Sequence, residues 1–170
     1  MVFLQYLLPQ HFLSRLMFRF ARIENHWVKN NFTRWFIKQY KVNLSEAEIE
    51  NIEDFIHFND FFTRSLKPSL RPISESKIIS PVDGVVSQSG KINDSQIVQA
   101  KGRKYSVSAL TADEPFKEIQ NGSFATIYLS PKDYHRIHMP CEGTLISMNY
   151  IPGDLFSVNQ NTVDNIDGVF

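Results

Sequence analysis

The sequence has little cysteine, no net charge and no long apolar run, and each shortage excludes a class of protein or site. The single cysteine, Cys141, excludes an internal disulfide and a metal site made of several cysteines. The 18 Lys and Arg residues balance the 18 Asp and Glu residues, so the overall charge does not point to nucleic acid. No apolar run approaches the roughly 20 residues that span a bilayer. The apolar start also lacks the small-residue cleavage site of a signal peptide.

What the sequence does contain is the composition of a folded protein. Its 170 residues are 42% hydrophobic and 21% charged, which is typical of a globular chain rather than a disordered one. The length suits one domain with a core of its own.

The first forty residues differ from the rest in charge and in aromatic content. They hold both tryptophans and one acid, Glu24, against six basic residues: Arg15, Arg19, Arg22, Lys29, Arg34 and Lys38. Residues 42–60, in contrast, carry six acids and no Lys or Arg. The spacing after Pro9 predicts a helix whose apolar face consists of Phe12, Leu13, Leu16, Phe20 and Ile23. A second helix is predicted over about 25–40.

These two predicted helices have three interpretations. Helices that are cationic on one side and aromatic on the other can lie in a lipid headgroup region. They can instead pack on their own domain with solvated arginines. An acid-poor start with arginines would also suit an organelle transit peptide, although the start has little serine. The pattern favours the membrane surface.

The rest of the chain predicts a short helical part and then strands. Ser45 followed by Glu48 has the spacing of a capping box and predicts a helix start. Pro68 and Pro72 predict an extended connector over 59–73. From Ile78, β-branched runs alternate with turn residues, which predicts strands within 77–92, 95–102, 104–110, 122–130, 135–140, 143–151 and 154–159.

The predicted fold class is therefore α+β, with N-terminal amphipathic helices followed by a mostly antiparallel β domain. We divide the chain into a helical segment that associates with membranes (1–42), a helix and extended connector (43–77), and a β-rich domain (78–170).

The stretch YLSPKDYHRIHMP, residues 128–140, carries His135 and His138. Ser130 followed by a proline and an acid predicts a single helical turn before the histidines. If that turn continues, both imidazoles lie on one face and could share a metal. If the stretch is extended, they point to opposite faces. Spacing alone leaves metal binding, acid/base chemistry, and packing or capping open.

The stretch SPVDGVV, residues 80–86, places one carboxylate, Asp83, between apolar residues. It suits either a hairpin turn at Asp83-Gly84 or an acid that orients a histidine. No nucleophile accompanies that pair. The sequence has no G-x-S-x-G elbow, Cys141 sits in a turn-like PCEG, and the Gly-Ser pair at 122–123 is predicted to open a strand.

Six motifs in order resemble the phosphatidylserine decarboxylase family, the pyruvoyl-dependent enzymes that make phosphatidylethanolamine and carbon dioxide. They are F-x-x-F-F-x-R-x-L-K-P (58–68), RPI (71–73), PVDG (81–84), QAKG (99–102), YLSPKDYHRIHMP (128–140) and PGDLFSVN (152–159). In this family a proenzyme cleaves itself at a Gly-Ser bond, and the serine becomes a pyruvoyl group. The resemblance therefore implies a carboxy-lyase and zymogen.

The resemblance implies a role for each candidate residue. Asp83 and His138 match the charge relay that activates the serine for self-cleavage. His135 matches the acid/base group of decarboxylation, in which the pyruvoyl carbonyl forms a Schiff base with the substrate amine and acts as an electron sink. No metal is implied.

The resemblance also implies partners and a location. They are the substrate phosphatidylserine, an anionic phospholipid membrane, the C-terminal α chain and, as a further partner to test, a second copy in a homodimer; nucleic acid is not among them. The implied location is peripheral, on the cytoplasmic face of a bacterial inner membrane.

The sequence departs from the family in one respect. The cleavage motif, Leu-Gly-Ser-Thr or a close variant, is absent, and the sequence stops at DNIDGVF within a β domain that should continue. We therefore expect the N-terminal part of the β chain, incomplete at its C-terminus, without the pyruvoyl-forming serine and inactive alone. The alternatives are a non-catalytic membrane-surface protein that keeps the fold, and an H-x-x-H metalloprotein.

Overall fold

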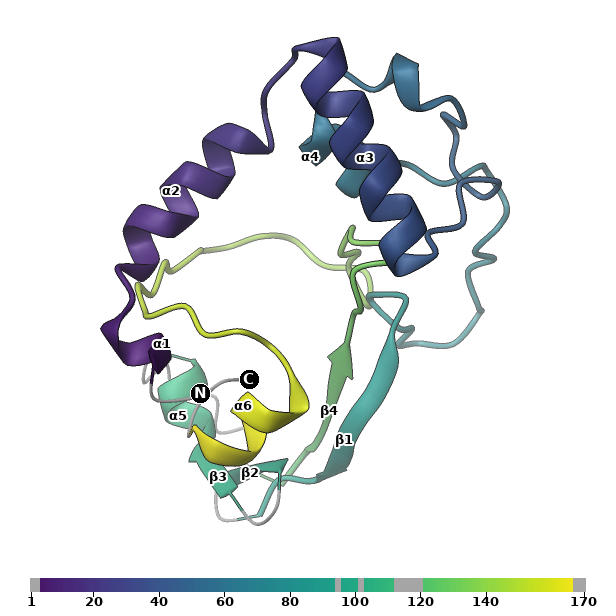
Figure 1. Cartoon of the computed structure of the whole chain (residues 1–170). Coiled ribbons are helices and arrows are strands. Elements are labelled where there is room, and N and C mark those ends of the chain that lie inside the picture. Colours follow the sequence, from purple (N-terminus) through teal and green to yellow (C-terminus); the bar gives the residue numbers. More distant parts are fainter. Residues whose placement is uncertain (1–3, 94–95, 101–102, 112–120, 167–170) are drawn as a thin grey trace. The chain divides into compact units, whose positions relative to one another are not determined.

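The structure is a computed structural model that describes residues 4–93, 96–100, 103–111 and 121–166. In chain order the elements are α1 (Leu4–Leu7), α2 (Gln10–Phe20), α3 (His26–Tyr40), η1 (Ile52–Asp54), α4 (Phe58–Phe62), β1 (Val85–Lys91), β2 (Gln96–Ala100), β3 (Arg103–Ser106), α5 (Val107–Leu110), β4 (Ser123–Tyr128) and α6 (Gln160–Asn165) (Figure 1). Helices and antiparallel strands together confirm the predicted α+β class. Residues 101–102 of the QAKG motif and residues 167–170 of the final DNIDGVF stretch lie outside the described residues.

The chain forms two compact units. The helical unit comprises Ser14–Val85 and Tyr128–Thr144, and the strand unit comprises Met1–Leu13, Val86–Ile127 and Leu145–Phe170. Each is described by itself. The predicted three-part division stays a prediction.

The helical unit is built around α3, whose start and end are both set by local signals. The Asn25 side chain accepts hydrogen bonds from the backbone N–H groups of Trp27 and Val28, which satisfies two donors at the helix N-terminus. Lys41 closes the helix in a left-handed conformation, with its N–H bonded to the Ile37 carbonyl. The helix predicted over 25–40 is confirmed, and so is the one after Pro9.

The core of the helical unit is aromatic. Phe36, Val42, Phe55 and Phe61 are buried and pack together, with Phe58 and Phe62 of α4 against them. Phe61 is fully buried. The aromatic faces of α3 and α4 therefore share one core.

The helix predicted to start at Ser45 is wrong. The backbone N and Oγ of Ser45 donate to the Asn43 side chain instead. Ala47 then forms an isolated antiparallel bridge with Leu66, and the Glu48 N–H donates to the Ser65 carbonyl (3.0 Å). Pairing with a distant segment has replaced the local helical bonds that the capping box predicted.

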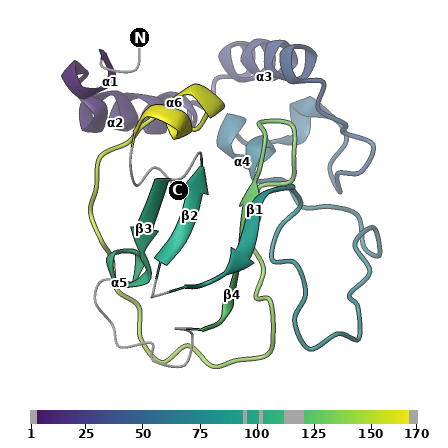
Figure 2. The ribbon, with the colours of Figure 1, turned by 90° about the horizontal axis from the view of Figure 1, so that it is seen from below.

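The strand unit contains two separate pairs of strands, β1 with β4 and β2 with β3 (Figure 2). β2 and β3 are antiparallel, with a register shift between Val98 and Ala100. In the other pair, the Ile92 N–H bonds to the Gly122 carbonyl while Ser87 bonds to the Thr126 carbonyl, so these strands are antiparallel too. Ile92, Ile97 and Val107 form a small core with Phe124 against it.

Three predicted strands are wrong, and a fourth, within 104–110, ends at Ser106 because helix α5 begins at Val107. Residues 135–140, 143–151 and 154–158 have neither strand nor helix structure. Apolar residues in these stretches are exposed, among them Ile137, Leu145, Ile146 and Met148. Among the described residues, no helix is long and apolar enough to cross a membrane.

Candidate functional site

A pocket of about 770 Å³ lies within the helical unit. Its walls come from side chains within the segments 65–83 and 134–139, and they include Arg71, Asp83, Tyr134, Arg136 and His138. Two residues that are widely separated in the sequence and were both predicted to be functional, Asp83 and His138, therefore line the same pocket. The main chain supports this arrangement, because the His138 N–H donates to the Pro81 carbonyl (2.8 Å) and the Ile79 N–H to the Pro140 carbonyl (2.9 Å).

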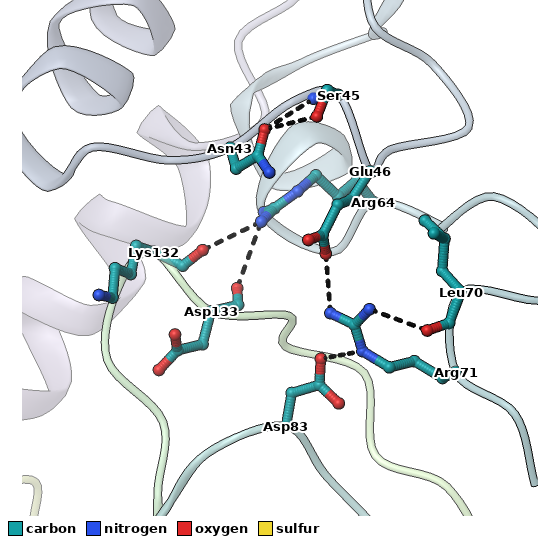
Figure 3. Close-up of polar contacts among 9 residues, drawn as sticks. All are labelled: Asn43, Ser45, Glu46, Arg64, Leu70, Arg71, Asp83, Lys132 and Asp133. Atoms are coloured by element: carbon teal, nitrogen blue, oxygen red, sulfur yellow. Dashed lines mark hydrogen bonds and ion pairs between the residues drawn. The ribbon is translucent and has the colours of Figure 1, made fainter.

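Asp83 forms an ion pair with Arg71 rather than a hydrogen bond to a histidine. Arg71 Nε donates to Asp83 Oδ2 (2.6 Å), and Arg71 Nη2 donates to Glu46 Oε2 (2.8 Å) (Figure 3). The hydrogen bonds that Arg71 donates to the Glu46 and Asp83 carboxylates raise the pKa of its guanidinium. Arg71 thus lies between two acids, Glu46 and Asp83, and holds the Asp83 carboxylate at the pocket wall.

His138 is exposed and interacts with Tyr134. Its Nε2 lies 3.0 Å from the Tyr134 hydroxyl, and the two rings are stacked with centroids 5.6 Å apart. Asp83 and His138 share no hydrogen bond in the part of the chain that the structure describes. They line the same pocket, in which the Asp83 carboxylate binds Arg71 and the His138 ring binds Tyr134.

His135 does not line this pocket and has different partners from His138. Its ring stacks on Phe62 with centroids 4.2 Å apart, and its Nε2 lies 3.0 Å from the Ser130 carbonyl oxygen. Burial lowers the pKa of His135; the Ser130 carbonyl and Asp133 oppose that change, and Arg64 adds to it. The imidazole is therefore neutral at neutral pH, which is the form that accepts a proton.

The turn before His135 differs in detail from the predicted helical turn. The Asp133 N–H donates to the Ser130 carbonyl (2.9 Å), and the Asp133 carboxylate accepts from the N–H and hydroxyl of Ser130 (2.7 and 2.8 Å). No helix follows, because residues 134–139 lack regular structure. The two histidines are separated by their partners: His135 packs against α4, and His138 faces the pocket.

The described residues contain no group of three or more His, Cys, Asp or Glu side chains that could hold a metal ion. His135 and His138 use their Nε2 atoms for other contacts, with the Ser130 carbonyl and the Tyr134 hydroxyl.

Comparisons with known proteins identify the family of the chain. The family model for phosphatidylserine decarboxylase matches residues 58–170, and a second model, described as PSD, matches residues 1–41. The chain belongs to the phosphatidylserine decarboxylase family. The first match includes Asp83, His135 and His138, so the motif resemblance in the sequence is confirmed at the level of the family.

Several curated relatives are similar over nearly the whole chain. Proteins named phosphatidylserine decarboxylase proenzyme from Shewanella woodyi, Methylobacillus flagellatus and Pseudomonas fluorescens are 54%, 51% and 52% identical to it. Each alignment covers 98% of this chain and 59–60% of the relative. The chain therefore spans about 60% of the length of these phosphatidylserine decarboxylase proenzymes.

Sequence reasoning did not assign roles to four residues that contact the candidate site residues. Arg71 binds Asp83, Tyr134 binds His138, Phe62 stacks on His135, and Arg64 binds the turn before His135. All four lie inside motifs shared with the phosphatidylserine decarboxylase family, so the motif positions were the available signal.

Proposed function

We propose that this chain is part of a phosphatidylserine decarboxylase that matures by cutting itself and converts phosphatidylserine to phosphatidylethanolamine and carbon dioxide. The observation that carries the proposal is the shared pocket of Asp83 and His138 in a chain of this family. The names of the relatives supply the substrate and the word proenzyme.

In this proposal Asp83 and His138 serve self-cleavage. The His138 imidazole takes the proton from an attacking serine hydroxyl, and the Asp83 carboxylate stabilises the resulting imidazolium. In the structure Asp83 Oδ2 is bonded to Arg71, so the proposed relay needs a further hydrogen bond from the His138 ring to the Asp83 carboxylate. Tyr134 orients the His138 ring in this proposal, because its hydroxyl contacts His138 Nε2.

His135 serves decarboxylation in this proposal. A pyruvoyl group formed from the cleaved serine would supply an electron-accepting carbonyl next to the substrate amine. The pocket of about 770 Å³ has room for such a group and carries cationic side chains, but its imidazole is that of His138. His135 lies outside the pocket lining, so its assignment to decarboxylation rests on the family motif and on its neutral ring. The neutral ring of His135 can hold and return the proton that replaces the lost carboxylate.

A chimera tests these roles. Residues 1–170 are joined to the C-terminal part of the Shewanella woodyi relative, and self-cleavage and carbon dioxide release from phosphatidylserine are measured. We expect cleavage and decarboxylation in the parent chimera. Asp83→Asn and His138→Ala should block cleavage, whereas His135→Ala should cleave and then lose at least about 100-fold in decarboxylation, in line with the usual contribution of an acid/base group.

His26→Gln is the matched control, because His26 is exposed at the start of α3 and lines no part of the pocket. Cleavage of the Asp83→Asn and His138→Ala chimeras at the parent rate would refute the proposed relay. A chimera that never releases carbon dioxide, although it binds vesicles, would instead support a non-catalytic membrane-surface protein.

We also propose that residues 1–170 alone neither cleave themselves nor decarboxylate. The Gly-Ser pair in this sequence opens strand β4 at Ser123, and no Leu-Gly-Ser-Thr motif is present to supply a pyruvoyl group. Carbon dioxide release by the purified 170-residue chain would overturn this proposal.

A further part of the proposal is a peripheral location on an anionic membrane, at the cytoplasmic face of a bacterial inner membrane. Helix α2 has no buried residue, and its exposed apolar side chains include Phe12, Leu16 and Phe18. Trp27 of α3 is 76% exposed. Aromatic side chains beside arginines suit the boundary between headgroups and acyl chains.

Co-sedimentation with vesicles tests the membrane proposal. We expect binding to vesicles that contain phosphatidylserine, weaker binding to vesicles of phosphatidylcholine alone, and loss of binding as salt rises. Phe12→Ser with Leu16→Ser should abolish binding, whereas Ile137→Ser, a matched exposed apolar change outside α2, should not. Equal binding to both kinds of vesicle would refute the anionic preference.

A homodimer is the remaining part of the proposal, and light scattering of the purified chain tests it.

A further inference from the structure

The helical unit buries an arginine whose role the proposed function does not explain. Arg64 is 5% exposed, and its buried Nε and Nη1 atoms have no hydrogen-bond partner among the described residues. Burial lowers the pKa of this guanidinium, and Glu46 and Asp133 oppose that change. A cation is costly to bury, so the contacts that Arg64 does make indicate what it is there to hold.

Those contacts lie on the turn before His135. Arg64 Nη2 donates to the main-chain oxygens of Lys132 (3.1 Å) and Asp133 (3.4 Å) (Figure 3). On the other side of the histidine, Arg136 Nε donates to the main-chain oxygen of Thr63 (2.7 Å). The residue before Thr63 is Phe62, on which the His135 ring stacks. Three consecutive residues, Phe62 to Arg64, thus hold the ring and both flanks of His135.

The hydrogen bond of His135 then defines which ring nitrogen carries the proton. A carbonyl oxygen only accepts, so the contact between His135 Nε2 and the Ser130 carbonyl requires a proton on Nε2. In the neutral ring the lone pair is consequently on Nδ1. The hydrogen bond of the His135 ring to the described residues is at Nε2, not at that atom.

We propose that Phe62, Thr63 and Arg64 form a positioning platform that holds His135 as the Nε2–H tautomer, which leaves Nδ1 as the atom that exchanges a proton. The reaction that this atom would serve rests on the proposed function, whereas the tautomer and its dependence on the platform do not. Arg64 and Phe62 are positioning residues in this proposal, because they act through His135.

Nitrogen-15 NMR of histidine-labelled 170-residue chain tests the platform at a pH well above the 6.5 that is ordinary for histidine. In the unchanged chain we expect His135 to carry its proton on Nε2 alone. In Arg64→Gln we expect that preference to be lost, with both tautomers averaged. The matched control is Lys29→Gln, which removes another buried cation that bonds to main-chain carbonyls, those of Glu53 and Phe55.

A second pair of variants covers the case in which Arg64→Gln does not fold. Phe62→Leu removes the ring that stacks on His135. In this variant too, we expect the His135 proton to be shared between Nδ1 and Nε2 rather than held on Nε2. Phe58→Leu removes an aromatic ring from the same helix that packs on Phe62 but not on His135, and it should leave the tautomer unchanged. A proton on Nδ1 in the unchanged chain, or an unchanged tautomer in Phe62→Leu, would overturn the platform. None of these results depends on decarboxylation, so they are separable from failure of the proposed function.

Discussion

The helical unit and the strand unit are stabilised by different kinds of contact. In the helical unit, ring contacts lead from Phe20 through Phe32, Phe58 and Phe62 to His135. In the strand unit, the core consists of the aliphatic side chains Ile92, Ile97 and Val107 with one aromatic partner, Phe124.

The two units also differ in how they use buried charge. The helical unit buries Lys29 and Arg64, and each of them donates to main-chain carbonyls. Among the side chains of the strand unit whose burial is described, none is a buried cation. Aliphatic packing depends little on direction, whereas ring stacking and charged hydrogen bonds fix orientation. The unit that holds Asp83, His135 and His138 is the one with the connected series of ring contacts and the two buried cations.

The largest expected effect is the loss of Phe61, the fully buried ring at the centre of the helical unit. Phe61→Ala should lower the free energy of unfolding by about 3–5 kcal/mol, because it removes a buried ring and leaves a cavity. The matched change in the strand unit is Phe124→Ala, which should cost about 1–2 kcal/mol because Phe124 is only partly buried. Urea unfolding measures both, and a larger loss for Phe124→Ala would reverse the comparison.

The next effect concerns the buried cation of α3. Lys29 Nζ donates to the main-chain oxygens of Glu53 (2.9 Å) and Phe55 (2.5 Å). Lys29→Met keeps most of the apolar stem but leaves both carbonyls without this donor, so we expect a loss of about 2–3 kcal/mol. Thermal unfolding at one pH measures it. A variant as stable as the parent would show that the buried charge is not needed for folding.

A smaller effect is the pH dependence that His135 adds to stability. Its pKa is lowered in the folded chain, whereas in the unfolded chain it is about 6.5. As the pH falls below about 6.5, the unfolded chain binds the proton first, so folding stability decreases until the pH passes below the lowered value. Above about 6.5 the ring is neutral in both states and adds no slope.

The free energy of unfolding should therefore decrease less between about pH 7 and pH 5 in His135→Gln than in the parent chain. Urea midpoints at a series of pH values measure the difference, and His26→Gln, at an exposed histidine, serves as the control. An identical slope in the parent and in His135→Gln would show that burial does not disfavour the charged ring.

The smallest expected effect is at an exposed ion pair that shares a residue with the Lys29 contact. Arg34 Nη2 lies 3.2 Å from Glu53 Oε1, with side chains 52% and 60% exposed. Because water screens such a pair, Arg34→Met should cost less than about 1 kcal/mol. Unfolding of Arg34→Met beside Lys29→Met compares the exposed contact to Glu53 with the contacts of a buried cation to Glu53 and Phe55. A larger loss for Arg34→Met would contradict the importance of burial.

The sequence by itself determined the features whose signals are local. The helix over 25–40 was predictable because Asn25 caps its own neighbours, and the strand at Gly122-Ser123 because turn residues precede β-branched ones. The family motifs also placed Asp83, His135 and His138 among the candidate residues, although their chemical roles remain predictions.

Only the tertiary structure decided which residues these side chains meet. The capping box at Ser45 failed because Ala47 and Glu48 pair with Leu66 and Ser65, which no local pattern could reveal. Likewise, Arg71 holds Asp83 and Phe62 stacks on His135 because segments far apart in sequence pack together. Local capping depends on a few neighbouring residues, whereas the partners of a side chain depend on how distant segments bury their apolar surface.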